Sequence, residues 1–106
     1  MDDPVLVYTT WPDAAAAEAA GRALVAAKLA ACVNILPGMV SVYAWQGEVE
    51  RASEAVMIVK TTAGHAGAVT AAVRTAHPYE TPAILTLPVS GGDAAYLAWI
   101  AAESRG

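Results

Sequence analysis

The period of the hydrophobic positions changes several times along the chain, and each change predicts a new element. Residues 5–10 form a short β-prone run that ends before Pro12, a residue suited to the first turn of a helix. Residues 13–30 are almost all strong helix formers, interrupted by Gly21, and they predict a helix. Thr10 or Asp13 can cap the free N–H groups at the start of that helix.

A long β-hairpin is predicted next. Residues 32–36 and 39–45 are strand-like and are separated by Pro37-Gly38, which predicts a bend or a bulge. Residues 46–48 form a plausible hairpin turn, and a second strand-like run covers residues 54–62. The two runs together form a hairpin that extends past a compact domain of this size.

The rest of the chain predicts a helix, a strand and a second helix. The first covers about residues 64–76 and ends at His77, because a residue before proline avoids helical backbone angles. Residues 82–89 form an apolar run bounded by prolines, as in a buried strand. A turn at residues 91–93 then opens a last helix with apolar residues at helical spacing.

The order β-α-β-β-α-β-α predicts an α+β fold. It is a ferredoxin-like βαββαβ sandwich with a long β-hairpin and an extra C-terminal helix. Right-handed crossovers place the two main helices on one face of the antiparallel sheet. The length of 106 residues predicts a single domain over residues 1–106.

Composition adds a prediction of self-association. Hydrophobic residues make up 57% of the chain and charged residues 15%, against a usual charged share of about a quarter. The far end of the hairpin carries Tyr43, Trp45 and Val49, which need a partner to cover them. The alternative is an alanine-biased sequence in which alanine simply fills the helix surfaces.

Charge and cysteine content narrow the function classes. The net charge is −4 and the six basic residues are scattered, so we expect no nucleic-acid partner. No apolar run approaches the roughly 20 residues that span a bilayer, and the acidic start lacks a signal-peptide layout, so we expect no membrane partner. Cys32 is the only cysteine, which is typical of a reducing compartment and predicts a cytoplasmic location.

The segment from His77 to Pro82 holds the most informative chemistry. It places an imidazole, a phenol and a carboxylate between two prolines that restrict the loop. His77 and Glu80 could ligate a borderline divalent ion such as copper or zinc. Alternatively, His77 stabilises the negative pole of a helix end. A tight metal site needs a third or fourth ligand, from elsewhere in the chain or from another copy.

Other motifs do not indicate catalysis. The chain has no phosphate-binding P-loop and no dinucleotide-binding glycine motif. None of its serines adjoins a histidine in the sequence, and no pattern asks for a catalytic triad. We therefore do not expect an enzyme. Cys32 by itself is typical of a small buried hydrophobic residue.

Five segments, in this order, resemble the CutA divalent-cation tolerance family. They are Leu29-Ala30-Ala31-Cys32-Val33-Asn34, Ser41-Val42-Tyr43-Ala44-Trp45-Gln46-Gly47-Glu48-Val49-Glu50, Lys60-Thr61-Thr62, His77-Pro78-Tyr79-Glu80-Thr81-Pro82, and Tyr96-Leu97-Ala98-Trp99-Ile100. The resemblance covers about residues 5–102. It implies a ferredoxin-like subunit in a homotrimer whose hairpins pair between subunits. It also implies tolerance to divalent metals, copper above all, an architecture like that of PII signalling proteins, and no catalytic reaction.

One departure from the family concerns the metal ligands. Some members carry a cysteine, a histidine and a glutamate at three positions that here are Thr9, Ala76 and Ala83. The candidate metal ligands that remain are Cys32, His77 and Glu80. We therefore expect Cu²⁺ or another divalent cation to bind without being held tightly.

Three functions remain open. The first is a trimeric, metal-responsive binding protein. The second is a PII-like trimer that senses a small anion or metabolite in clefts between subunits, with polar groups from Tyr43, Lys60, His77, Tyr79 and Glu80. The third is a purely structural or anchoring oligomer.

Overall fold

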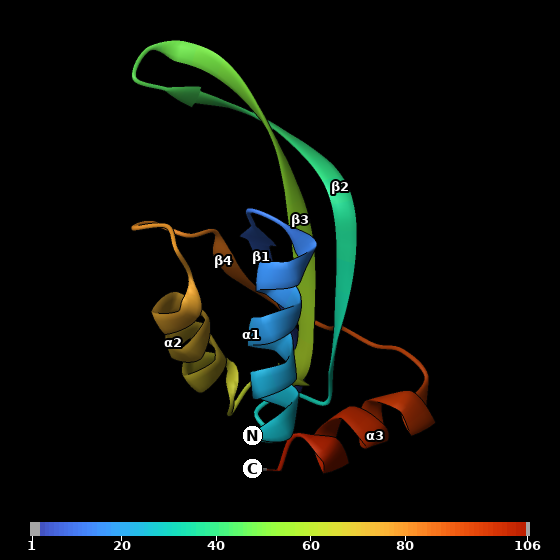
Figure 1. Ribbon diagram of the computed structural model, residues 1–106. Helices are drawn as coiled ribbons and strands as arrows, with labels where there is room; N and C mark the ends of the chain where they lie inside the picture. The colour runs from blue at the N-terminus through green and yellow to red at the C-terminus, as the bar shows by residue number, and fades with distance from the viewer. Residues whose placement is uncertain (1–2, 106) are drawn as a thin grey trace.

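The computed structural model describes residues 3–105, and its elements follow the predicted order (Figure 1). They are β1 (Pro4–Trp11), α1 (Ala14–Ala26), β2 (Cys32–Trp45), β3 (Glu48–Thr62), α2 (Ala66–Ala76), β4 (Ile84–Pro88) and α3 (Ala94–Glu103). The strands form one antiparallel sheet in the order β2-β3-β1-β4, and α1 and α2 cover one face of it. The predicted α+β fold, with its long hairpin and extra C-terminal helix, is confirmed.

The core lies between the sheet and the helices α1 and α2. Every second residue of β1 is buried: Val5, Val7, Thr9 and Trp11. Leu24 of α1 and Val73 of α2 pack in the same core, where burying one such side chain contributes about 1.5–3 kcal/mol. The Trp11 indole N–H donates to Thr9 Oγ1 at 2.7 Å, and the Thr9 hydroxyl donates to the Met57 carbonyl at 2.8 Å. The polar atoms of these two buried side chains are therefore paired.

The first helix is shorter than predicted, and it ends at Ala26 rather than at residue 30. Lys28 adopts a φ of 58°, and the Leu29 N–H donates to the Leu24 carbonyl at 3.0 Å. This is a Schellman-type end, in which one left-handed residue closes the last turn. Strong helix formers continue past this point, so the sequence pattern does not predict the end of the helix. Among the other elements, α2 begins two residues later than predicted, and β4 has five residues where eight are predicted.

The long hairpin is formed by β2 and β3. Their pairing runs from Cys32↔Lys60 to Trp45↔Glu48, and the predicted bulge falls between Leu36 and Met39. The two-residue turn has φ angles of 50° at Gln46 and 81° at Gly47, as a type I′ turn requires. β3 begins six residues earlier than predicted, because its polar first half continues the ladder to the turn.

The hairpin gives the protomer an elongated shape, since its far end extends beyond the helices (Figure 1). The principal extents are 45 × 25 × 21 Å. The radius of gyration is 14.3 Å, against about 13 Å for a compact chain of about 100 residues. Over the described residues 3–105, no helix has both the length and the apolar character needed to cross a membrane.

Candidate functional site

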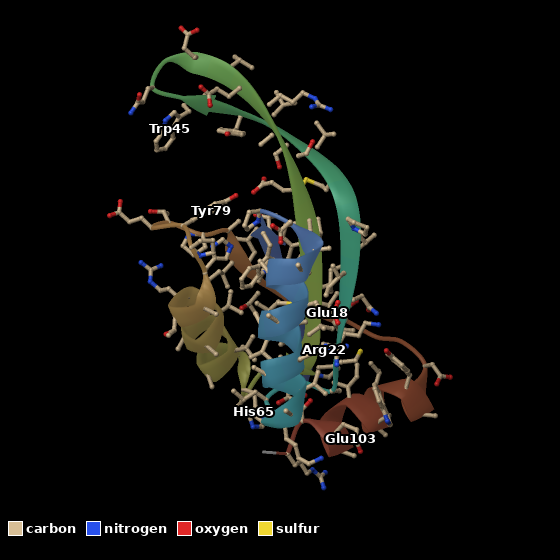
Figure 2. The ribbon with its side chains drawn as sticks, viewed as in Figure 1. Glu18, Arg22, Trp45, His65, Tyr79 and Glu103 are labelled. Atoms are coloured by element: carbon tan, nitrogen blue, oxygen red, sulfur yellow. The ribbon has the colours of Figure 1, made fainter. Side chains whose placement is uncertain are left out.

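A cleft of about 530 Å³ lies where the far half of the hairpin passes the loop that follows α2. Its side chains come from that hairpin, from the end of β1 and from the loop. Two groups stand out among its lining residues: three aromatic rings from Tyr43, Trp45 and Tyr79, and three carboxylates from Glu50, Glu54 and Glu80. Figure 2 shows Trp45 on the side of the hairpin that faces Tyr79. The cleft is therefore acidic and partly aromatic.

Tyr79 is held at the cleft by a stack of three rings. The Trp11 and His77 rings have centroids 4.3 Å apart, and those of His77 and Tyr79 are 4.7 Å apart. Trp11 is buried in the core, while Tyr79 is 41% exposed. The stack therefore runs from the core to the cleft and fixes the direction of the Tyr79 ring.

His77 anchors the loop through both of its ring nitrogens. Nε2 lies 2.6 Å from the Thr10 carbonyl oxygen, and Nδ1 lies 3.1 Å from the Tyr79 backbone nitrogen. A carbonyl oxygen only accepts and a backbone N–H only donates, so Nε2 carries the proton and Nδ1 accepts. Both nitrogens are therefore occupied, and a metal ion could bind either one only by displacing a hydrogen bond.

Glu54 is held in place by two hydroxyl groups. The Ser41 hydroxyl donates to Oε1 at 2.7 Å, and the Tyr79 phenol donates to Oε2 at 3.2 Å. Burial, followed by the nearby Glu54 carboxylate, raises the pKa of Tyr79 above its usual 10.0. Tyr79 therefore remains a protonated donor at neutral pH, and it links the loop to the hairpin.

Cys32 and Lys60 lie together, away from the cleft. They oppose each other in the β2–β3 ladder, and Lys60 Nζ donates to Tyr96 Oη at 2.9 Å. The Cys32 sulfur is 3.8 Å from the same oxygen. The hydrogen bond between Lys60 and Tyr96 is the main cause that raises the pKa of Lys60. Lys60 is six residues beyond Glu54 on β3, about 20 Å at about 3.3 Å per residue.

The structure thus divides the residues predicted from the sequence. Tyr43, Tyr79 and Glu80 line one cleft, with His77 behind Tyr79. Cys32 and Lys60 form a separate group with Tyr96, and Cys32 is half-buried. Within residues 3–105, no group of three or more His, Cys, Asp or Glu side chains is placed to hold a metal ion.

Sequence reasoning missed Trp45, Glu50 and Glu54 as lining residues of the cleft. The signal was present in the turn at residues 46–48, which sets the register of the hairpin. With that register Tyr43 opposes Glu50, and the alternation of side chains puts Glu54 on the same face as Glu50. The polar character of residues 48–53 hid the part of β3 that carries Glu50.

The chain has relatives of known family. A family model described as CutA1 divalent ion tolerance protein matches residues 5–103. The divalent-cation tolerance protein CutA of Pectobacterium atrosepticum is 44% identical over 103 residues, which cover 97% of this chain and 94% of that protein.

Solved structures agree in fold. The crystal structure of divalent ion tolerance protein CutA1 from Ehrlichia chaffeensis matches with a TM-score of 0.94 at 32% identity, covering 100% of this chain and 99% of that one. A protein from Archaeoglobus fulgidus, described as a periplasmic divalent cation tolerance protein CutA, matches with a TM-score of 0.92 at 37% identity. That match covers 96% of this chain and 99% of the other.

Proposed function

Since this chain belongs to the family of CutA1 divalent ion tolerance proteins, we propose that it binds divalent cations, copper above all, as a homotrimer. The observation that carries the proposal is the exposed Glu80 carboxylate at an acidic cleft, where a second copy of the chain could add further ligands. Carboxylate oxygens bind divalent ions, and among the first-row divalent ions Cu²⁺ generally binds a given set of ligands most tightly.

A second copy of the chain would complete the metal site. Glu80 is exposed at the cleft, whereas both His77 nitrogens are hydrogen-bonded within the protomer. Cys32, the other ligand predicted from the sequence, lies with Lys60 and could reach this cleft only from a neighbouring protomer. Ligation by His77 and by Cys32 stays a prediction, and Glu80 is the ligand that the geometry favours.

Apolar exposure supports the homotrimer. Leu85 and Leu87 of β4 pair with Tyr8 and Leu6 of β1, on the sheet face away from α1 and α2, and are 60% and 44% exposed. Along the hairpin, Val42 and Val49 are 68% and 80% exposed. Such a surface favours an interface between protein chains. The outer edges of β2 and β4 end the sheet and would also be covered by neighbouring hairpins.

The PII-like sensor of a small ligand is a second candidate, and the cleft itself favours it. Its volume lies in the usual range of small-molecule sites, about 300–1,000 Å³. Its three carboxylates favour a cationic ligand over the small anion considered from the sequence. Lys60, which an anion would need, lies with Tyr96 instead. No catalytic step is part of either proposal.

Two measurements test the proposed function. Light scattering should give the mass of three chains, and a single-chain mass would contradict the trimer. Calorimetric titration with Cu²⁺ should show binding that Glu80→Gln weakens about tenfold, which corresponds to about 1.4 kcal/mol. Glu103→Gln is the matched control, because Glu103 is an exposed carboxylate on α3, far from the cleft (Figure 2). Equal copper affinities in both variants and the unmodified protein would exclude the cleft as the site.

We also place the protein in the cytoplasm, on the ground of its single free cysteine. The relative from Archaeoglobus fulgidus is described as periplasmic, so the location needs its own test. Fractionation of the source cells should recover the protein with cytoplasmic markers. Recovery with periplasmic markers would contradict this location and would leave the proposed metal binding untouched.

A further inference from the structure

We propose that the cleft between the hairpin and the loop after α2 binds a linear aliphatic polyamine, a chain of methylene groups that carries two or more ammonium groups. The inference deepens the second candidate function, the sensing of a small ligand in this cleft. It does not depend on copper binding, and the two can fail separately.

The charge of the cleft selects a polycation. Three carboxylates line it, from Glu50 and Glu54 on β3 and from Glu80 on the loop, and its described lining residues include no lysine or arginine. The whole chain has a net charge of −4, so the field outside the cleft also attracts cations. A ligand with several ammonium groups can pair with more than one of these carboxylates at once.

The spacing of the carboxylates distinguishes a chain from a single ion. Glu50 and Glu54 are four residues apart on the same face of β3, about 13 Å between their Cα atoms at about 3.3 Å per residue. Glu54 cannot lean freely toward Glu50, because Ser41 and Tyr79 each donate to one of its carboxylate oxygens. Oxygen ligands of one divalent ion must all lie within about 2.0–2.6 Å of it. Carboxylates spread along a strand suit charges spread along a chain.

The aromatic rings supply the rest of the recognition. Tyr43 lies opposite Glu50 in the hairpin, and Trp45 and Tyr79 line the same cleft. The faces of such rings attract ammonium groups, and they also give methylene groups an apolar surface. In the single protomer the three side chains are 42%, 59% and 41% exposed, which leaves their rings open to a ligand or to a neighbouring copy of the chain.

The cleft is partly organised before a ligand arrives. The ring stack from Trp11 through His77 fixes Tyr79, and Tyr79 and Ser41 fix Glu54. A ligand therefore meets one aromatic wall and one carboxylate that need little ordering, which lowers the entropy lost on binding.

Spermidine, a triamine, is the probe for the test, and n-hexylamine, with one ammonium group, is the matched monocation. Spermidine is titrated by calorimetry into the intact protein at low salt. In a second measurement, the change in tryptophan emission on adding spermidine is compared between the unmodified protein and Trp45→Phe. The variants are Glu50→Gln, Glu54→Gln and Tyr79→Leu. Glu103→Gln is the control, because it removes the same charge from α3, outside the cleft.

We expect saturable spermidine binding that exceeds hexylamine binding by at least tenfold. Each of the three cleft variants should weaken it about three- to tenfold, and Glu103→Gln should leave it within twofold. An equal loss in Glu103→Gln would mean that net charge alone attracts spermidine and would overturn the proposal. Equal affinity for hexylamine, or no change in the cleft variants, would overturn it too.

Copper titration of the same variants separates this inference from the metal proposal. If copper binds the cleft and spermidine does not, the polyamine inference fails and the metal site stands. If spermidine binds there and copper does not, the metal proposal fails and the sensing of a cationic ligand stands.

Discussion

His77 Nε2 donates to the carbonyl oxygen of Thr10 across 2.6 Å, and this bond ties the loop after α2 to the end of β1. The two residues are 67 positions apart, so the contact can form only in the folded chain. The bond fixes the position of the His77 ring, against which the Tyr79 ring packs. His77, which the sequence predicts as a metal ligand, thus positions one wall of the cleft.

The first prediction concerns that anchor. Replacing His77 by leucine removes the bond to Thr10 and the acceptor for the Tyr79 N–H. One net intramolecular hydrogen bond is worth about 0.5–1.5 kcal/mol, and a partner left unpaired costs more. We expect His77→Leu to lower the free energy of unfolding by about 1–3 kcal/mol, measured by urea denaturation.

His65→Leu is the control for the first prediction. His65 precedes α2, at the end of the protomer away from Tyr79 (Figure 2), and Thr62 is its side-chain partner. The control should cost less than about 1 kcal/mol, because it breaks one hydrogen bond at a half-exposed position. Equal losses in the two variants would show that His77 does not anchor the loop.

The second prediction concerns alkaline pH. Burial and Glu54 raise the pKa of Tyr79 above its usual 10.0, so the folded protein keeps this proton to higher pH than the unfolded chain does. The resulting stability is fully present below pH 10 and is lost as the pH rises through the folded-state pKa. Tyr79→Phe keeps the ring but has no proton to lose. The difference in Tm between the two proteins should therefore shrink from pH 8 to pH 11.5, and a constant difference would contradict the shift.

The order of the elements followed from local signals in the sequence. Strong helix formers, the proline after His77 and the glycine in the hairpin turn each act over a few residues, and each predicted its element correctly. The end of α1 was not predicted because Lys28 adopts a left-handed conformation, which lysine rarely does.

The cleft was harder to predict, because it depends on register and on contacts between distant segments. Tyr79 and Glu80 adjoin in sequence and were expected together. Glu50 and Glu54 join them only because the turn at residues 46–48 sets the register of β2 and β3. That register decides which side chains of the two strands lie on the same face of the hairpin. Lys60 lies about 20 Å from Glu54 along β3, so it could join the cleft residues only across a boundary between subunits.

The third prediction concerns the packing of α1 on the sheet. A Cβ atom added at Gly21 would lie 2.6 Å from Val33 Cγ2 and 3.0 Å from Met57 Sδ. Crowding of a packed core typically costs about 1–3 kcal/mol, which exceeds the gain of about 1 kcal/mol in helix propensity. Gly21→Ala should therefore lower the Tm. Gly67→Ala in α2, where nothing lies within 4 Å of the added Cβ, should leave the Tm unchanged or raise it.

For this account of Gly21 to hold, Gly21→Ala must lower the Tm and Gly67→Ala must not. If Gly21→Ala raised the Tm as Gly67→Ala does, helix propensity would outweigh the contact with Val33. Helix α1 would then have room to move away from the sheet, and the close approach would not be a constraint on the fold.

The fourth prediction concerns Ala83, a lining residue of the cleft. Ala83 is exposed, so Ala83→Glu should fold normally and add a fourth carboxylate beside the other three. A further charged oxygen ligand should raise the Cu²⁺ affinity about tenfold, which corresponds to about 1.4 kcal/mol, in a calorimetric titration.

Ala102→Glu is the control, because it adds the same charge at an exposed position of α3. If both variants raised the copper affinity equally, the ion would be responding to net charge, and the cleft would lose its place as the metal site. If only Ala83→Glu did so, the absence of this carboxylate would explain why the natural chain is expected to hold copper only weakly.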